Sequence, residues 1–173
     1  MLFLASCSKD GDAGAKGDKG DPGATGPEGP AGAANVIYST WLDVPFKPDT
    51  IHTSGGKIDT IGYYSGINVP KLTLALLSTS DIKVYVNLNT AADPVIAPLP
   101  YVEESGIVIR FVAYEKAVQF SSNVDAGTYQ DRQGNKILQY RYVIIPGGVA
   151  ARKADNINWN DYAAVKAYLG LKD

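Results

Sequence analysis

The chain contains one cysteine, Cys7, and one histidine, His52, and these two residues limit its chemistry. A zinc site of the Cys/His type needs several such ligands, and a nucleophilic cysteine needs a neighbouring base. His52 lies among Thr50, Thr53, Ser54 and Gly55, where we expect an exposed loop without a catalytic partner. The sequence therefore predicts no metal site, no cofactor and no catalytic residue of this kind.

Carboxylates are the other groups that could act as acids or bases. Glu103 and Glu104 are adjacent, so on an extended chain they point to opposite sides and cannot act on one bond. A glycosidase needs two carboxylates about 5 to 9 Å apart across a cleft. Four aspartates in expected loops could supply them only if the fold brings them together: Asp81, Asp93, Asp125 and Asp131. A carbohydrate-active or other hydrolytic enzyme is thus the alternative to a non-enzymatic protein, which we favour because no catalytic motif is present.

Tyrosines provide a further surface for recognition, because each ring combines apolar area with a polar tip. Tyr63 and Tyr64 are adjacent, so one of them must face outward if the segment is a strand. We expect them to contribute to a surface that binds a glycan or a protein. Tyr140 and Tyr142 alternate with polar residues in an apolar segment, and we expect them to pack in the core.

Glycine occupies every third position from residue 11 to residue 34, in eight uninterrupted Gly-X-Y triplets. Only glycine fits on the axis of three intertwined polyproline-II chains, so this period predicts a collagen-like stalk of roughly 70 Å at about 3 Å per residue. A triple helix implies a homotrimer; the alternative is a disordered spacer in a monomer. The axial residues would be Gly11, Gly14, Gly17, Gly20, Gly23, Gly26, Gly29 and Gly32.

The first ten residues end in a short motif, Leu4-Ala5-Ser6-Cys7. It resembles the lipobox of bacterial lipoproteins, in which small residues precede a cysteine that is lipidated. The polar run at 8–12 also resembles the acidic signals that direct lipoproteins of Bacteroidota to the cell surface. The resemblance implies lipid attachment at Cys7, a signal that begins upstream of Met1, and a lipid-anchored, surface-exposed position in the outer membrane.

Charge separates the first 34 residues from the rest. They carry three of the chain's 16 basic and five of its 18 acidic residues, which leaves 13 of each in the remainder. A balanced domain has no electrostatic footprint for nucleic acid, and no apolar run approaches the roughly 20 residues needed to span a bilayer.

From residue 35 the hydrophobic pattern is mainly that of strands. We expect strands near 36–41, 58–64, 82–88 and 136–145, an extended or edge segment at 95–101, a hairpin of 107–114 and 118–122, and a polar loop at 125–135. A short helix should have Pro70 in its first turn, and a final helix should begin at the Asn158 cap, with Trp159, Tyr162, Val165 and Leu169 on one face and Gly170 at its end. The predicted fold is mainly β, an antiparallel β-sandwich head with one short internal helix and a C-terminal helix, preceded by the stalk.

These patterns divide the chain into a truncated lipoprotein signal and anchor region (1–10), a collagen-like stalk (11–34) and a β-rich head (35–173). The whole arrangement resembles a group of Bacteroidota lipoproteins described as collagen-like, which share segments similar to 34–39, 84–86, 98–101 and 140–147. The resemblance covers nearly the whole chain and implies location and architecture but no activity. We therefore expect a non-enzymatic surface lipoprotein whose head serves adhesion, binding or envelope structure.

Overall fold

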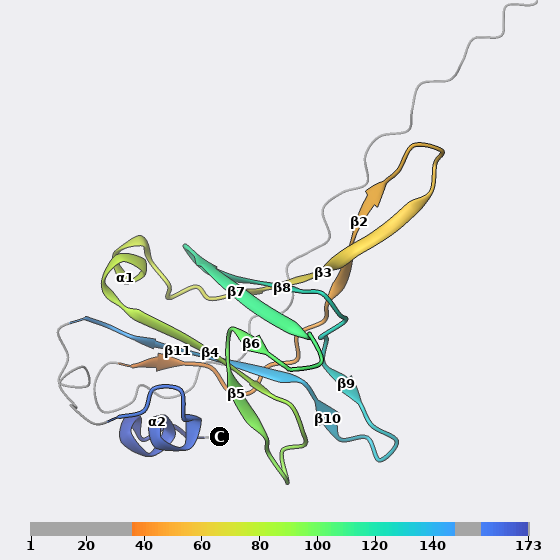
Figure 1. Cartoon of the computed structure of the whole chain (residues 1–173). Helices are drawn as coiled ribbons and strands as arrows, with labels where there is room; N and C mark the ends of the chain where they lie inside the picture. The colour runs from red at the N-terminus through yellow and green to blue at the C-terminus, as the bar shows by residue number, and fades with distance from the viewer. Residues whose placement is uncertain (1–35, 148–156, 173) are drawn as a thin grey trace, which may run out of the picture.

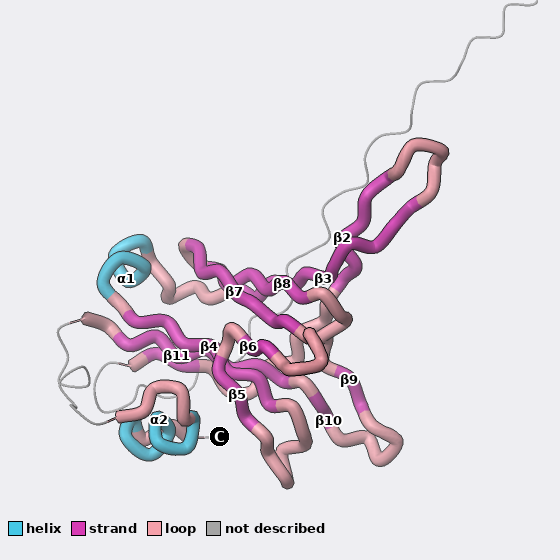
Figure 2. The backbone as a smooth tube through the Cα atoms, viewed as in Figure 1, coloured by secondary structure: helices cyan, strands magenta, loops and turns pink. Residues whose placement is uncertain are grey.

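The computed structural model describes residues 36–147 and 157–172. The predicted lipid-attachment residue Cys7 and the eight triplet glycines lie outside these residues. Within them the protein is mainly β, with antiparallel strand pairs and two helices (Figures 1 and 2). Neither of the two described helices is long and apolar enough to cross a membrane.

One sheet has four strands in the order β1–β11–β4–β5, and another has five in the order β2–β3–β8–β7–β6. The four-stranded sheet consists of β1 (Ile37–Tyr38), β11 (Gln139–Ile145), β4 (Asp81–Asn87) and β5 (Ile96–Pro98). The five-stranded sheet consists of β2 (Lys47–His52), β3 (Ile58–Asn68), β8 (Ala117–Ser122), β7 (Val108–Tyr114) and β6 (Tyr101–Val102). A separate pair is formed by β9 (Tyr129–Gln130) and β10 (Lys136–Ile137), and the helices are α1 (Leu74–Thr79) and α2 (Tyr162–Leu169).

The main hydrophobic core contains side chains of both sheets. Val84 and Val86 of β4 and Tyr140 of β11 share it with Val118 and Phe120 of β8. The rings of Phe120 and Tyr140 have centroids 5.0 Å apart. The alternation predicted for 82–88 and the core position predicted for Tyr140 and Tyr142 are confirmed.

The four-stranded sheet is buried on both faces. A second cluster joins Tyr85 of β4 and Val143 of β11 to three residues of α2, Tyr162, Val165 and Leu169. The apolar face predicted for the C-terminal helix is therefore confirmed, and Gly170 ends the helix with a φ of 63°. Asn158 is not its N-cap, because the side chain of Asp161 accepts the amide hydrogen bonds of the first turn.

The five-stranded sheet has one open face. In β7 and β8 the inward residues are buried or half-buried, whereas Arg110, Val112, Gln119 and Ser121 between them are exposed. At one side of this sheet β2 and the first half of β3 extend away from the rest of the protein as a two-stranded ribbon (Figure 1).

Other local predictions were also wrong, and the loop expected at 125–135 contains strand β9. His52 is the last residue of β2 and not a loop residue, and Pro48 lies inside that strand, where an edge position tolerates a residue without an N–H. The predicted strand 136–145 is divided at Leu138, whose φ of 59° interrupts the pleat. The first helix begins after the Thr73 cap, so Pro70 precedes it instead of lying in its first turn.

Candidate functional site

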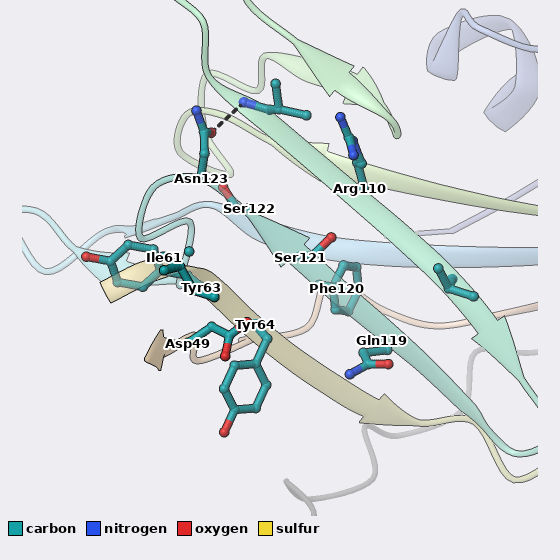
Figure 3. Close-up of a pocket in the computed structure, with 13 residues that line it drawn as sticks. Asp49, Ile61, Tyr63, Tyr64, Arg110, Gln119, Phe120, Ser121, Ser122 and Asn123 are labelled. Atoms are coloured by element: carbon teal, nitrogen blue, oxygen red, sulfur yellow. Dashed lines mark hydrogen bonds between the residues drawn. The ribbon is translucent and has the colours of Figure 1, made fainter. Parts of the chain in front are cut away.

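Four side chains form a line across the open face of the five-stranded sheet. The strand registers place Lys47 of β2 opposite Tyr64 of β3, Tyr64 opposite Ser121 of β8, and Ser121 opposite Arg110 of β7. Directly opposed residues on neighbouring strands share a face of the sheet. These residues therefore stand side by side, and we call them the cross-sheet row (Figure 3 shows the last three).

Three residues of the cross-sheet row, Tyr64, Ser121 and Arg110, line a groove of about 660 Å³. Its base contains residues with little or no side chain, among them Gly62 and Ser121. A Cβ atom on Gly62 would lie 3.1 Å from the backbone oxygen of Ser122, so the two strands approach closely there. The remaining lining residues include Asp49, Ile61, Tyr63, Tyr64, Arg110, Val112, Gln119 and Asn123.

Tyr63 and Tyr64 lie on opposite sides of β3, as the sequence predicts for adjacent strand residues. Tyr64 is 42% exposed and is on the open face, in line with Ser121. Tyr63 pairs with Pro48 and with Ser122, which is buried, so its ring is only partly exposed. Both residues line the groove. Tyr64 is the ring that a ligand on this face could cover.

Most polar side chains of the groove are available for a ligand. The side chains of Tyr64, Arg110, Gln119 and Ser121 form no hydrogen bond or ion pair with another residue of the described ranges. Asn123 differs, since its Oδ1 accepts from Val108 N and its Nδ2 donates to Gly106 O, each at 2.9 Å. The groove thus combines one exposed ring with a planar guanidinium, an amide and a hydroxyl.

The aspartates considered for hydrolysis are held in local structure. Asp131 Oδ1 accepts from the amides of Gln133 and Asn135, each at 2.8 Å, and Asn135 Nδ2 donates to Asp131 Oδ2 at 2.9 Å. The side-chain hydrogen bond from Asn135 lowers the pKa of Asp131. This carboxylate therefore stabilises the turn between β9 and β10.

The other three aspartates do not line the groove, and Asp81 is the first residue of β4 and not a loop residue. Asp125 accepts from the amide of Gly127, Asp93 from the side chain of Asn89, and Asp81 is 3.4 Å from Lys83 Nζ. The carboxylate of the groove is Asp49, which the sequence did not single out. Among residues 36–147 and 157–172, no group of three or more His, Cys, Asp or Glu could hold a metal ion.

A second hollow, of about 650 Å³, lies between the β4–β5 connection and the start of α2. Trp41 and Tyr162 line it, with ring centroids 5.6 Å apart. Its buried amide, Asn87, is satisfied by the backbone of Asn89, Thr90 and Val95. These contacts hold the connection in place, so this hollow offers fewer available polar groups than the groove.

Sequence reasoning identified Tyr63 and Tyr64 but missed Arg110 and Gln119. The usable signal was the alternation within the hairpin of β7 and β8, where polar residues occupy every second position. That alternation indicates an exposed face, but the register of four strands is needed to place Arg110 in line with Tyr64. Comparison of the chain with protein-family models, curated proteins and solved structures found no significant match.

Proposed function

We propose that this chain is a non-enzymatic surface lipoprotein whose head, a β-sandwich, binds a glycan in the groove beside Tyr64. The observation that carries the proposal is the exposed Tyr64 ring next to polar side chains that have no partner in the described residues. A sugar ring has an apolar C–H face and a rim of hydroxyls. Such a ring can pack on Tyr64 while Gln119, Ser121 and Arg110 exchange hydrogen bonds with its hydroxyls.

The groove suits a small ligand better than a protein. Its volume of about 660 Å³ lies in the range of ligand sites, about 300 to 1,000 Å³. A stable protein interface buries about 800 Å² on each partner and usually has an apolar centre. Here the centre of the face is Ser121 with Gln119 beside it on the same strand, and both are polar. An oligosaccharide is therefore the ligand that we favour.

Loss of the Tyr64 ring tests the binding site. The full chain, labelled and kept reduced, is applied to a glycan array, and the best ligand is measured by calorimetry. Tyr64→Ala should weaken binding about tenfold, since it removes a stacking contact and its apolar area. Tyr114→Ala is the matched control, because Tyr114 is a 50% exposed tyrosine of β7 that does not line the groove. Equal affinities for the two variants would contradict the site.

The anchor is a separate part of the proposal. It is supported by the Leu-Ala-Ser-Cys motif at 4–7 and the polar run that follows. Mass spectrometry of membranes from the native host should find acyl chains on Cys7. A soluble product with an unmodified Cys7 would refute the anchor and leave the groove unaffected.

The stalk is the third part, and its period of three supports a homotrimer. Sedimentation of residues 8–173 should give a trimer, and circular dichroism should show a cooperative collagen transition. Gly20→Ala should return the protein to a monomer, because a methyl group does not fit on the triple-helix axis. A monomer at tens of micromolar without such a transition would make residues 11–34 a spacer.

A further inference from the structure

We propose that the ligand is an acidic sugar, whose ring covers Tyr64 and whose carboxylate pairs with Arg110. This inference rests on the proposed glycan site and names its ligand class. Three features of the cross-sheet row support this inference: the spacing of its side chains, the small residue at its centre, and the distribution of charge along the row.

The spacing of the cross-sheet row leaves room for one sugar ring. Tyr64 and Arg110 are separated by one strand, β8, and strands in a sheet lie about 4.8 Å apart, so their Cα atoms are about 10 Å from each other. Ser121 lies between them and has only a hydroxymethyl side chain. A ring placed against Tyr64 can therefore extend over the small Ser121 side chain and direct a substituent toward Arg110.

The charges of the row favour an anion. Three lysines of the described residues already have carboxylate partners: Lys57 with Asp59 at 2.7 Å, Lys83 with Asp81 at 3.4 Å, and Lys136 with Asp43 at 2.5 Å. Arg110 and Lys47, at the two ends of the row, have no ion-pair partner among the described residues.

The groove's own carboxylate does not neutralise Arg110. Asp49 is on β2, opposite Gly62, whereas Arg110 is on β7, three strands away in the order of the sheet. Asp49 can accept from sugar hydroxyls near Tyr64. The Arg110 end of the groove therefore remains positive, and an uncharged sugar would provide no anionic partner for the guanidinium.

Arginine is suited to this task because its planar guanidinium can donate two parallel hydrogen bonds to one carboxylate. An exposed pair of this kind is weak in water, worth up to about fivefold in affinity. It is also screened by salt. We therefore expect Arg110 to select between acidic and neutral sugars, while the Tyr64 contact supplies most of the affinity.

The experiment compares acidic probes with neutral counterparts. Calorimetry or ligand-observed NMR measures the full chain with trigalacturonate against galactotriose and with 3′-sialyllactose against lactose, at about 50 and 500 mM NaCl. We expect at least one acidic probe to bind about three- to fivefold more tightly than its counterpart at low salt, and the ratio to fall toward one at high salt. Arg110→Gln should reduce the low-salt ratio to less than twofold.

Arg132→Gln is the matched control, because Arg132 is an exposed arginine in the β9–β10 turn and does not line the groove. It removes the same charge and should leave the ratio unchanged. Neutral sugars that bind as well as acidic ones, in a manner sensitive to Tyr64→Ala, would overturn the acidic ligand but preserve the glycan site. If Arg110→Gln binds the acidic probes as selectively as wild type does, the role of Arg110 would be overturned. Absence of binding to all four probes and to the array would overturn both proposals.

Discussion

The guanidinium carbon of Arg141 lies 4.9 Å from the centre of the Tyr38 ring, and both side chains are buried. Arg141 is on β11 and Tyr38 on the neighbouring β1. The same guanidinium donates to the hydroxyl of Tyr162 in α2 and, at 2.5 Å, to the carbonyl of Lys172. One buried cation therefore connects two strands to the C-terminal helix and to the residues that follow it.

Arg141→Ala should destabilise the protein by about 3 to 5 kcal/mol. It creates a cavity and removes the charged donor to the Tyr162 hydroxyl and to the Lys172 carbonyl. Urea unfolding measures the loss, and hydrogen exchange should show that the amides of α2 lose protection first. Arg132→Ala, at an exposed turn position, should change stability by less than about 0.5 kcal/mol. A loss below about 1 kcal/mol for Arg141→Ala would show that the helix is held mainly by its apolar face.

Lys116→Gly should stabilise the β7–β8 hairpin. Lys116 has a φ of 61°, a conformation that costs a residue with a Cβ about 1 kcal/mol and glycine almost nothing. Its side chain is exposed and its ion pair with Glu115 is long, at 4.0 Å, so removal of this side chain should cost little stability. The midpoint of thermal unfolding should rise. The same change at Leu138, with a φ of 59°, should lower stability, because that side chain packs against the main core.

Gly127→Ala should destabilise the protein by about 1 to 3 kcal/mol. An added Cβ would lie 3.0 Å from the backbone nitrogen of Phe46 and 3.1 Å from Asp125 Oδ1. Gly134→Ala adds a Cβ in open space and strains only the backbone, whose φ is 84°, so about 1 kcal/mol is expected. Chemical denaturation of the two variants under identical conditions separates close packing from backbone strain. A larger destabilisation by Gly134→Ala than by Gly127→Ala would indicate that residues 44–46 move easily to make room for the added Cβ.

Alkaline pH should destabilise the fold through two buried tyrosines. Burial raises the pKa of Tyr85 and of Tyr140, and the nearby Tyr162 and Asp125, respectively, add to the effect. In the unfolded chain both ionise near pH 10, so the unfolded state releases protons and the free energy of unfolding falls as pH rises above about 10.

Tyr140→Phe tests this pH dependence. At neutral pH it should cost about 1 to 3 kcal/mol, because the Tyr140 hydroxyl donates to the Ala126 carbonyl at 2.6 Å and that buried carbonyl loses its donor. Above pH 10 the difference from wild type should narrow, since one ionisable group has been removed. Urea unfolding at pH 8, 10 and 11 measures both effects. If the free energy of unfolding falls with pH equally in the variant and in wild type, Tyr140 does not contribute to the loss of stability at alkaline pH.

At acid pH the relevant group is Asp43. Partial burial opposes its ionisation, but hydrogen bonds from Lys136 and Gln139 outweigh that effect and lower its pKa. The stabilisation is therefore present above the unfolded pKa of about 3.9 and is lost as pH falls through the lower folded value. Asp43→Asn should cost less than about 1 kcal/mol at pH 7, because the pair is half exposed, and almost nothing near pH 2. A difference that is the same at both pH values would exclude an ionic contribution.

Elements with local apolar alternation could be predicted from the sequence, and those without it could not. Strand β4 and the β7–β8 hairpin have clear period-two patterns. Strand β2 was missed because all six of its residues are exposed and one is a proline. The break at Leu138 was missed because leucine rarely adopts a positive φ, and nothing in its neighbours signals one.

The groove was only partly predictable for a different reason. Adjacency alone shows that Tyr63 or Tyr64 must face outward. The position of Arg110 in line with that ring depends on the register of β3 with β8, whose paired residues are about 50 to 60 positions apart in the sequence, and on the register of β8 with β7. Those registers follow from packing of the core, which a single sequence does not reveal.

Strand β1 also determines how the head would respond to mechanical tension from the chain that precedes it. Any pull on residue 36 reaches the fold first through Ile37 and Tyr38, which pair with Ile144 and Val143 of β11. The bonds from Ser39 N to Tyr142 O and between Leu42 and Tyr140 extend that seam. Strand β11 then passes the load to β4 along seven paired positions. The ribbon of β2 and β3 lies outside this route, so tension applied at residue 36 would be borne by the doubly buried sheet while the open face keeps its shape.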